Sequence, residues 1–193
     1  MHRLINARRK RARDIIAEEL SQGQALIESI VEVDELAAIL LKYVRAAEEG
    51  AARLNLRLMA MTIRGMTHKR TLTASRFLYY AWFLANLSRE EVIAIATLYK
   101  NEALEPDRIS DNEARGRARV RTREELVPVF FPTERHLNST LQAATRTGLI
   151  VAASGWGSLV YETTPLMEEV ASLAPFRDAL EKEKGDESNR ARP

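Results

Sequence analysis

The sequence contains no cysteine, only six prolines and eight glycines, and no long hydrophobic run among its 193 residues. The lack of cysteine excludes disulfide frameworks, thiolate zinc sites and cysteine nucleophiles. The longest nearly uncharged apolar run, Phe77–Leu87, has 11 residues, whereas a membrane-spanning helix needs about 20. The basic N-terminus also lacks the continuous apolar stretch of a secretory signal. We therefore expect a cytoplasmic protein without a membrane span.

Residues typical of catalytic and metal sites are equally sparse. The three histidines, His2, His68 and His136, lie far apart and show none of the spacings at which proteins hold a metal. The chain has no glycine-rich phosphate loop, and no nucleophile stands at usable spacing from a base and an orienting group. We expect no metal, no cofactor and no enzymatic activity.

Positive charge is concentrated in two short segments, although the chain as a whole carries only +2. One segment runs from Arg8 to Arg13. The other has arginine at every second position: Arg115, Arg117, Arg119, Arg121 and Arg123. In an extended backbone these five side chains would share one face and follow a phosphate backbone, whereas in a helix they would scatter. We expect residues 105–122 to form a polar loop whose arginines pair loosely with nearby carboxylates until a partner orders them.

The N-terminal half has no proline before Pro106, which favours long helices. From Asp34, a candidate N-cap, apolar residues recur at steps of three and four as far as Met61. An unbroken helix from Asp34 to about Ile63 would be roughly 45 Å long, so part of its apolar stripe needs another partner. The preceding helix or a second copy of the chain can cover the stripe, and we expect a homo-oligomer. Gly50 is the position at which this helix can break or bend.

Three sequence patterns in the middle of the chain predict helices. Residues 73–87 are apolar on nearly every face, which predicts a helix at the centre of the core. Ser88 and Glu91 form a capping box that starts the next helix. Thr122 and Glu125 offer a second capping box, which predicts a short helix after the polar loop.

A helix with a polar outer face follows next. Thr133 can cap it and Gly148 can end it. Its outward face carries side chains that can read base edges, because asparagine and glutamine pair with adenine and arginine pairs with guanine. These candidates are Arg135, Asn138, Ser139, Gln142 and Arg146. A merely solvated face is the alternative, because residues 133–164 hold only two basic against two acidic residues, and phosphate neutralisation supplies most non-specific affinity.

Two short β-prone runs, 149–153 and 158–163, flank a glycine-containing turn and predict a hairpin. Trp156 stands at its tip, where the indole either contacts a partner or folds back over the strand. Thr164 and Pro165 then supply the cap and the first position of another helix.

This order of helices, strand, glycine-tipped hairpin and closing helix resembles that of winged-helix domains. Residues 122–170 would be the second half of such a domain. The resemblance implies a recognition helix at 137–148 and a wing tip at 154–157, and most winged helices bind duplex DNA.

Residues 50–170 are also similar to bacterial proteins of the abortive-infection type, which have a C-terminal winged helix. The similarity lies in Asn86-Leu87-Ser88 and in the sequence 161–166, which opens the last helix. One extra threonine, and Met167 where a glycine is common, depart from that pattern. The similarity implies a phage-defence or regulatory context and supplies no catalytic residues.

Together these signals predict a mainly α fold with a small β-hairpin, in which long N-terminal helices are followed by a winged-helix-like domain. We expect a helical arm or helical hairpin at 1–70 and the winged-helix-like domain at 71–174. Residues 175–193 are expected to form a C-terminal helix that frays from residue 181.

The functional hypothesis is a non-enzymatic regulator that binds duplex DNA. Its contacts would come from the helix 133–147, the wing 149–163 with Trp156, and the arginine run 115–123. The alternative is an oligomeric protein–protein interaction module, of a phage-defence type, that does not bind DNA.

Overall fold

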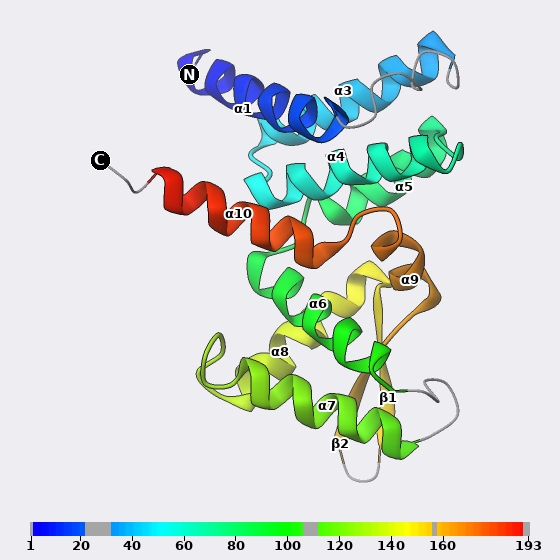
Figure 1. The fold of residues 1–193 in the computed structure, drawn as a ribbon, viewed down its shortest axis with the longest axis vertical. Helices are drawn as coiled ribbons and strands as arrows, with labels where there is room; N and C mark the ends of the chain where they lie inside the picture. Colours follow the sequence, from blue (N-terminus) through cyan, green and yellow to red (C-terminus); the bar gives the residue numbers. More distant parts are fainter. Residues whose placement is uncertain (1, 22–31, 106–111, 156–157, 191–193) are drawn as a thin grey trace. The chain divides into compact units, whose positions relative to one another are not determined.

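The computed structural model describes residues 2–21, 32–105, 112–155 and 158–190 (Figure 1). Helices dominate, and two short strands form one antiparallel sheet, which confirms the predicted mainly α fold with a small hairpin. The chain divides into two compact units: unit 1 is Met1–Leu87 with Val170–Pro193, and unit 2 is Ser88–Glu169. The expected ranges were 1–70, 71–174 and 175–193, so the structure groups residues 71–87 and 170–174 with the N-terminal helices.

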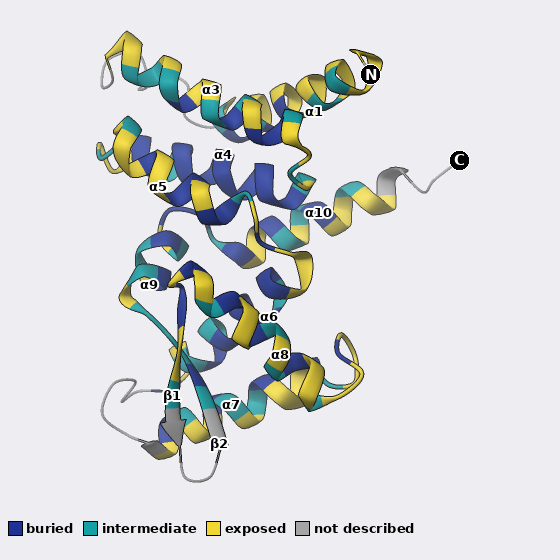
Figure 2. Ribbon diagram, turned by 180° about the vertical axis from the view of Figure 1, so that it is seen from behind, coloured by how far each residue is buried: buried dark blue, intermediate teal, exposed yellow. Residues whose placement is uncertain are grey.

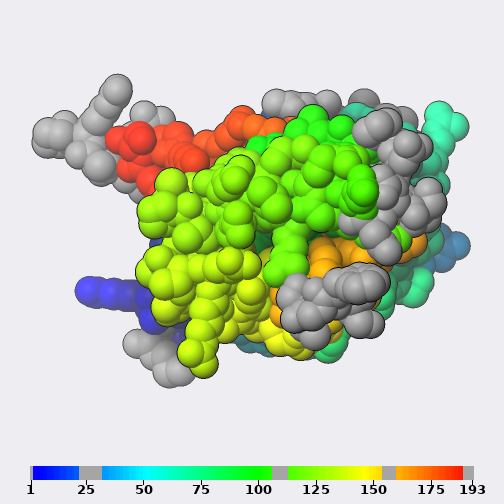
Figure 3. Space-filling view, turned by 90° about the horizontal axis from the view of Figure 1, so that it is seen from below, coloured from blue at the N-terminus to red at the C-terminus, as the bar shows by residue number. Residues whose placement is uncertain are grey.

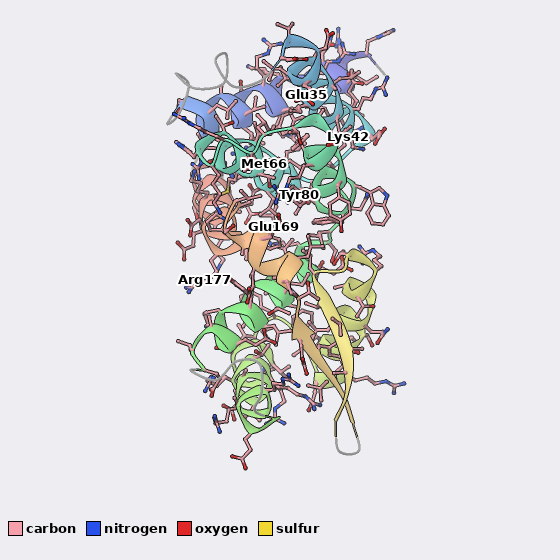
Figure 4. All side chains as sticks on the ribbon, turned by 90° about the vertical axis from the view of Figure 1, so that its right-hand side faces the viewer. Glu35, Lys42, Met66, Tyr80, Glu169 and Arg177 are labelled. Atoms are coloured by element: carbon pink, nitrogen blue, oxygen red, sulfur yellow. The ribbon has the colours of Figure 1, made fainter. Side chains whose placement is uncertain are left out.

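Unit 1 is built around one buried helix. Its elements are α1 (His2–Ser21), α3 (Val33–Glu49), α4 (Arg53–His68), α5 (Ala74–Leu84) and α10 (Phe176–Arg190). Helix α4 packs against the other four and is almost entirely buried, as its dark blue ribbon in Figure 2 shows. Met66 of α4 and Tyr80 of α5, both labelled in Figure 4, belong to the core of this unit.

The apolar stripe from Asp34 to Ile63 is divided between two helices, because the chain breaks at Gly50, the position at which the sequence allowed a break. This glycine has φ 105°, a left-handed conformation that side chains disfavour, and its N–H bonds to the carbonyls that end α3. Helix α4 begins anew at Arg53. Asp34 lies within the first turn of α3, and Glu32 is the N-cap residue. The second half of the stripe is buried in α4, at Leu54, Leu58 and Met61, whereas Leu40 in the first half remains exposed on α3.

The prediction of a central hub at 73–87 is wrong. Helix α5 buries Phe77 and Tyr80, but it leaves Leu78, Tyr79 and Trp82 exposed, at 39%, 53% and 61% of their surface. An apolar sequence therefore became a helix with one buried and one exposed face. The central position belongs to α4, whose sequence contains polar and charged residues that are paired inside the unit.

A buried ion cluster joins α1, α4 and α10. Glu19 and Arg57 are both fully buried, and the guanidinium of Arg57 donates to the Glu19 carboxylate at 2.8 Å. Glu19 also accepts from Arg64 at 3.0 Å and from Lys182 at 2.7 Å. The buried carboxylate thus has three cationic donors, which offset the cost of removing it from water. The bond from the Tyr43 hydroxyl to the carbonyl of Ala12 also ties α3 to α1.

The sequence predicted that the C-terminal helix frays from residue 181. In the structure α10 continues to Arg190. Its charged second half is fixed by ion pairs with α4. Arg53 donates to Glu183 at 3.1 Å, and Arg57 donates to Asp186 at 2.6 Å. Burial alone would raise the pKa of the Asp186 carboxyl, but hydrogen bonds and charge from Arg53 and Arg57 hold this pKa below its ordinary value.

The described residues of unit 2 form three helices, a hairpin and most of a fourth helix. Its elements are α6 (Arg89–Ala103), α7 (Asn112–Leu126), α8 (Glu134–Ala144), the 3-10 turn η2 (Thr145–Thr147), β1 (Ile150–Gly155), β2 (Ser158–Thr163) and the start of α9 (Pro165–Ala171). The capping box of Ser88 and Glu91 is present, with bonds of 2.8 Å and 3.1 Å in the two directions. The Thr133 side chain caps α8, as predicted.

The hairpin is confirmed in the predicted place. Gly148 has φ 73° and ends η2 just before β1. The strands then pair antiparallel in a register that runs from Ile150 opposite Thr163 to Gly155 opposite Ser158. The carboxylate of Glu102 on α6 accepts the Thr163 N–H at 3.1 Å, which anchors the hairpin to this helix. Trp156 lies outside the described residues.

The predicted loop at 105–122 is wrong over the residues that the structure describes from 112 onward, because they belong to α7. Its buried face is made of Ala114, Ala118, Thr122 and Leu126, four residues apart. Because this face has only one large apolar side chain, Leu126, it gives a weak sequence signal for an amphipathic helix. Thr122 is not an N-cap either, since its hydroxyl donates to the carbonyl of Ala118 at 2.8 Å within the helix.

Candidate nucleic-acid interface

Helix α7 arranges the five arginines in two rows instead of one extended stripe. Residues two apart on a helix are rotated by about 200°, so every second arginine returns to the same side. The first row, on one side of the buried face, is Arg115, Arg119 and Arg123. The second row, on the other side, is Arg117 and Arg121. Each row meets different carboxylates of unit 2.

The second row is fixed on one nearly buried carboxylate. Arg117 donates to Glu105 at 2.8 Å and 3.1 Å, and Arg121 donates to the other oxygen of Glu105. Arg121 also donates to the carbonyl of Asn101 at 3.1 Å. Hydrogen bonds from Arg117 and Arg121 hold the pKa of the Glu105 carboxyl below its ordinary value. This row therefore attaches α7 to the end of α6.

The first row is held more loosely and is partly exposed. Arg115 pairs with Glu162 of β2 at 3.2 Å. Arg119 and Arg123 both pair with Glu134, the first residue of α8, at 3.6 Å and 3.7 Å. These three cations thus lie along the side of α7 that meets α8 and β2.

Helix α8 turns a polar face outward beside this row. Figure 3 shows α7 and the start of α8 side by side on one face. An open depression on unit 2 is lined by the predicted base-reading residues together with two that the sequence did not single out as ligands: Arg135, Asn138, Ser139 and Gln142, with Glu134 and Tyr161. Arg135, Ser139 and Gln142 are exposed, and Asn138 is half-buried.

Tyr161 fixes one of these side chains. It is nearly buried on β2, and its hydroxyl donates to the amide oxygen of Gln142 at 3.1 Å. Burial raises the pKa of this hydroxyl above its ordinary value of 10, at which a phenol is already a donor at neutral pH. The alternation of the strand is the signal that could have placed Tyr161 on the face toward α8.

Arg146, the fifth predicted residue of this helix, lies in η2 and serves a different contact. Its guanidinium donates to the Glu91 carboxylate at 2.9 Å and to the carbonyl of Ala143 at 2.7 Å. Burial alone would raise the pKa of Glu91, but the bonds from Arg146 and from the Ser88 N–H hold it below its ordinary value. Arg146 therefore joins the end of α8 to the start of α6.

The overall charge of unit 2 is negative. Residues 88–169 contain ten Lys and Arg against thirteen Asp and Glu, a net charge of −3. Any attraction of a polyanion to this unit must therefore be local, at the first row and at Arg135. The long-range field of the unit does not favour it.

Among the residues that the structure describes, no group of three or more histidine, aspartate or glutamate side chains is arranged to hold a metal ion. Within the same residues, none of the helices has the length and apolar character needed to cross a bilayer. Comparisons of the chain with protein-family models, with curated proteins and with solved structures found no match.

Proposed function

We propose that unit 2 binds duplex DNA, with α8 in the major groove and the first row of arginines on the phosphates, and that the protein acts as a non-enzymatic regulator. The observation that carries this proposal is the outward face of α8. Four side chains capable of base recognition share it, and within the described residues of unit 2 Gln142 alone of these four has a side-chain bond, to Tyr161, that holds the unit together.

In this proposal each group of residues has a different task. Asn138 and Gln142 lie four positions apart on one side of α8, where each amide can pair with an adenine edge. Arg135, one turn before Asn138, has the bidentate geometry that suits guanine. The first row on α7 contacts phosphates, which fixes the register of α8 without reading sequence.

The test is fluorescence anisotropy of a labelled mixed-sequence duplex, titrated with protein at low and physiological salt. We expect micromolar or tighter binding that weakens steeply with salt. Changing Arg135 to alanine should weaken binding about fivefold to a hundredfold. The matched control is Arg177→Ala, which removes one exposed arginine from α10 of unit 1 and should leave binding within about twofold. Absence of binding at low salt would show that the proposal is wrong.

A second candidate function, protein–protein interaction, is favoured by the exposed face of α5. Trp82 lies four positions after Leu78 and three after Tyr79 on this helix, and the three side chains present two aromatic rings to solvent. Exposed tryptophan and tyrosine are typical of interface centres. Light scattering over a range of protein concentrations tests self-association through this face. The Trp82→Ala variant should remain monomeric at concentrations at which the wild-type protein associates, with or without DNA.

A further inference from the structure

Five arginines of unit 2 pair with carboxylates of two kinds. Glu91 and Glu105 expose only 6% of their side chains and accept from their arginines at hydrogen-bond distance. Glu134 exposes 42% of its side chain, and its oxygens lie 3.6 Å and 3.7 Å from Arg119 and Arg123. Exposed ion pairs of this length contribute little to stability and are screened by salt. The first kind of pair fixes helices in place, whereas the second kind can exchange its partner.

Glu134 is placed as a shared counter-ion. Its Oε1 faces Arg119 and its Oε2 faces Arg123, so one negative charge is divided between two cations. These three residues and Asn138 line one small hollow between α7 and α8. A phosphodiester likewise carries one negative charge and two free oxygens. It can therefore take the place of the Glu134 carboxylate opposite the same two guanidinium groups.

We propose that Glu134 is an internal competitor of the DNA phosphate. In the free protein it occupies Arg119 and Arg123, and DNA must displace it to reach them. This inference rests on the DNA-binding function proposed above and adds its regulation. Most substitutions in a binding site weaken binding. Removing the charge of Glu134 should instead strengthen DNA binding, because Arg119 and Arg123 no longer have to exchange a carboxylate for a phosphate.

The experiment compares Glu134→Gln with Glu124→Gln. Glu124 is an exposed residue of α7, so both variants remove one negative charge from the same region of unit 2. Each is titrated into the labelled duplex between about 50 and 200 mM salt. We expect Glu134→Gln to bind about fivefold to tenfold more tightly than the wild-type protein at low salt. The slope of the logarithm of its binding constant against the logarithm of salt concentration should become steeper by up to about two. This corresponds to about 0.9 for each added phosphate contact.

Glu124→Gln should stay within about twofold of the wild-type protein, since only the overall charge changes. A third variant adds Arg119→Ala and Arg123→Ala to Glu134→Gln, and it should lose the whole gain. Far-UV circular dichroism of each variant checks that the helices are intact.

The outcomes separate the two proposals. If Glu134→Gln and Glu124→Gln strengthen binding equally, or if the gain survives the loss of both arginines, the competitor role is wrong and DNA binding stands. If neither the wild-type protein nor Glu134→Gln binds the duplex at low salt, the DNA-binding function is wrong and the competitor role falls with it.

Discussion

The guanidinium of Arg146 lies on the carboxylate of Glu91, with Nη2 2.9 Å from Oε2. The same carboxylate accepts the Ser88 N–H at 2.8 Å, so one side chain closes the capping box of α6 and receives the end of α8. Arg146 is a candidate DNA contact by its position in the sequence. In the structure, its bond to Glu91 fixes the position of α8 against α6.

We therefore expect Arg146→Ala to lower stability more than it lowers DNA affinity. The loss of a charge-assisted hydrogen bond to a nearly buried carboxylate should cost about 1 kcal/mol or more. Urea unfolding followed by circular dichroism measures this cost. Arg135→Ala, on the exposed face of α8, is the control and should change the unfolding free energy by less than about 0.5 kcal/mol. A variant Arg146→Ala that unfolds like the wild-type protein but fails to bind DNA would contradict this assignment.

The same pair predicts a pH dependence of stability. Because Arg146 and Ser88 hold the pKa of Glu91 below its ordinary value of 4.5, the folded state prefers the ionised carboxylate. The resulting stabilisation is complete above about pH 5 and is lost as pH falls through the lowered pKa of the folded state. Urea unfolding between pH 3 and pH 7 measures this loss, and Glu91→Gln should flatten that part of the profile. If the unfolding free energy of Glu91→Gln falls with decreasing pH as steeply as that of the wild-type protein, other carboxylates cause the acid sensitivity.

The buried cluster in unit 1 predicts a sharp contrast between two neighbouring glutamates. Glu19→Gln removes the only negative charge in the centre of the described cluster, and its donors Arg57, Arg64 and Lys182 lose that counter-ion. We expect a loss of about 3 kcal/mol in the unfolding free energy. Glu18→Gln should cost less than about 1 kcal/mol, because Glu18 is half exposed. Thermal and urea unfolding of the two variants side by side provide the measurement, and equal losses would show that burial is not the cause.

Two helical glycines predict substitutions of opposite sign. A Cβ at Gly65 of α4 would lie 2.7 Å from the Cα of Leu173 and closer still to its carbonyl oxygen. Gly65→Ala should therefore destabilise the protein by about 1 to 3 kcal/mol. A Cβ at Gly116 of α7 meets no described atom within 4 Å, so Gly116→Ala should stabilise the helix by about 0.5 to 1 kcal/mol. Unfolding midpoints compare the two, and a stabilised Gly65→Ala would contradict the close approach of Leu173.

Local signals in the sequence predicted local structure well. The Ser88 capping box, the Thr133 cap, the end of η2 at Gly148 and the hairpin all depend on residues within a few positions of one another. Such bonds need only neighbouring residues, so a local pattern can predict them. The same capping pattern failed at Thr122 and Glu125, because packing continues α7 through these residues.

The features that were missed depend on distant partners. Helix α7 has no strong apolar stripe, and its arginines are neutralised by Glu105, Glu134 and Glu162 from other elements. Segment 73–87 was expected at the centre because it is apolar on nearly every face, whereas the structure has α4 there. Arg57 can be buried only because α1 and α10 bring carboxylates to it, and no local pattern in the sequence reports that arrangement.

The bond between Glu19 and Lys182 joins positions that are 163 residues apart, with the whole of unit 2 between them. At typical elongation rates, a ribosome needs roughly 10 to 30 s to add the intervening chain. Throughout that interval α1 and α4 lack the ammonium group that completes their cluster, whereas unit 2 is continuous and is synthesised before α10. The helices synthesised first are thus among the last to complete their contacts. Unit 2 can fold before α10, the last helix of unit 1, has been synthesised.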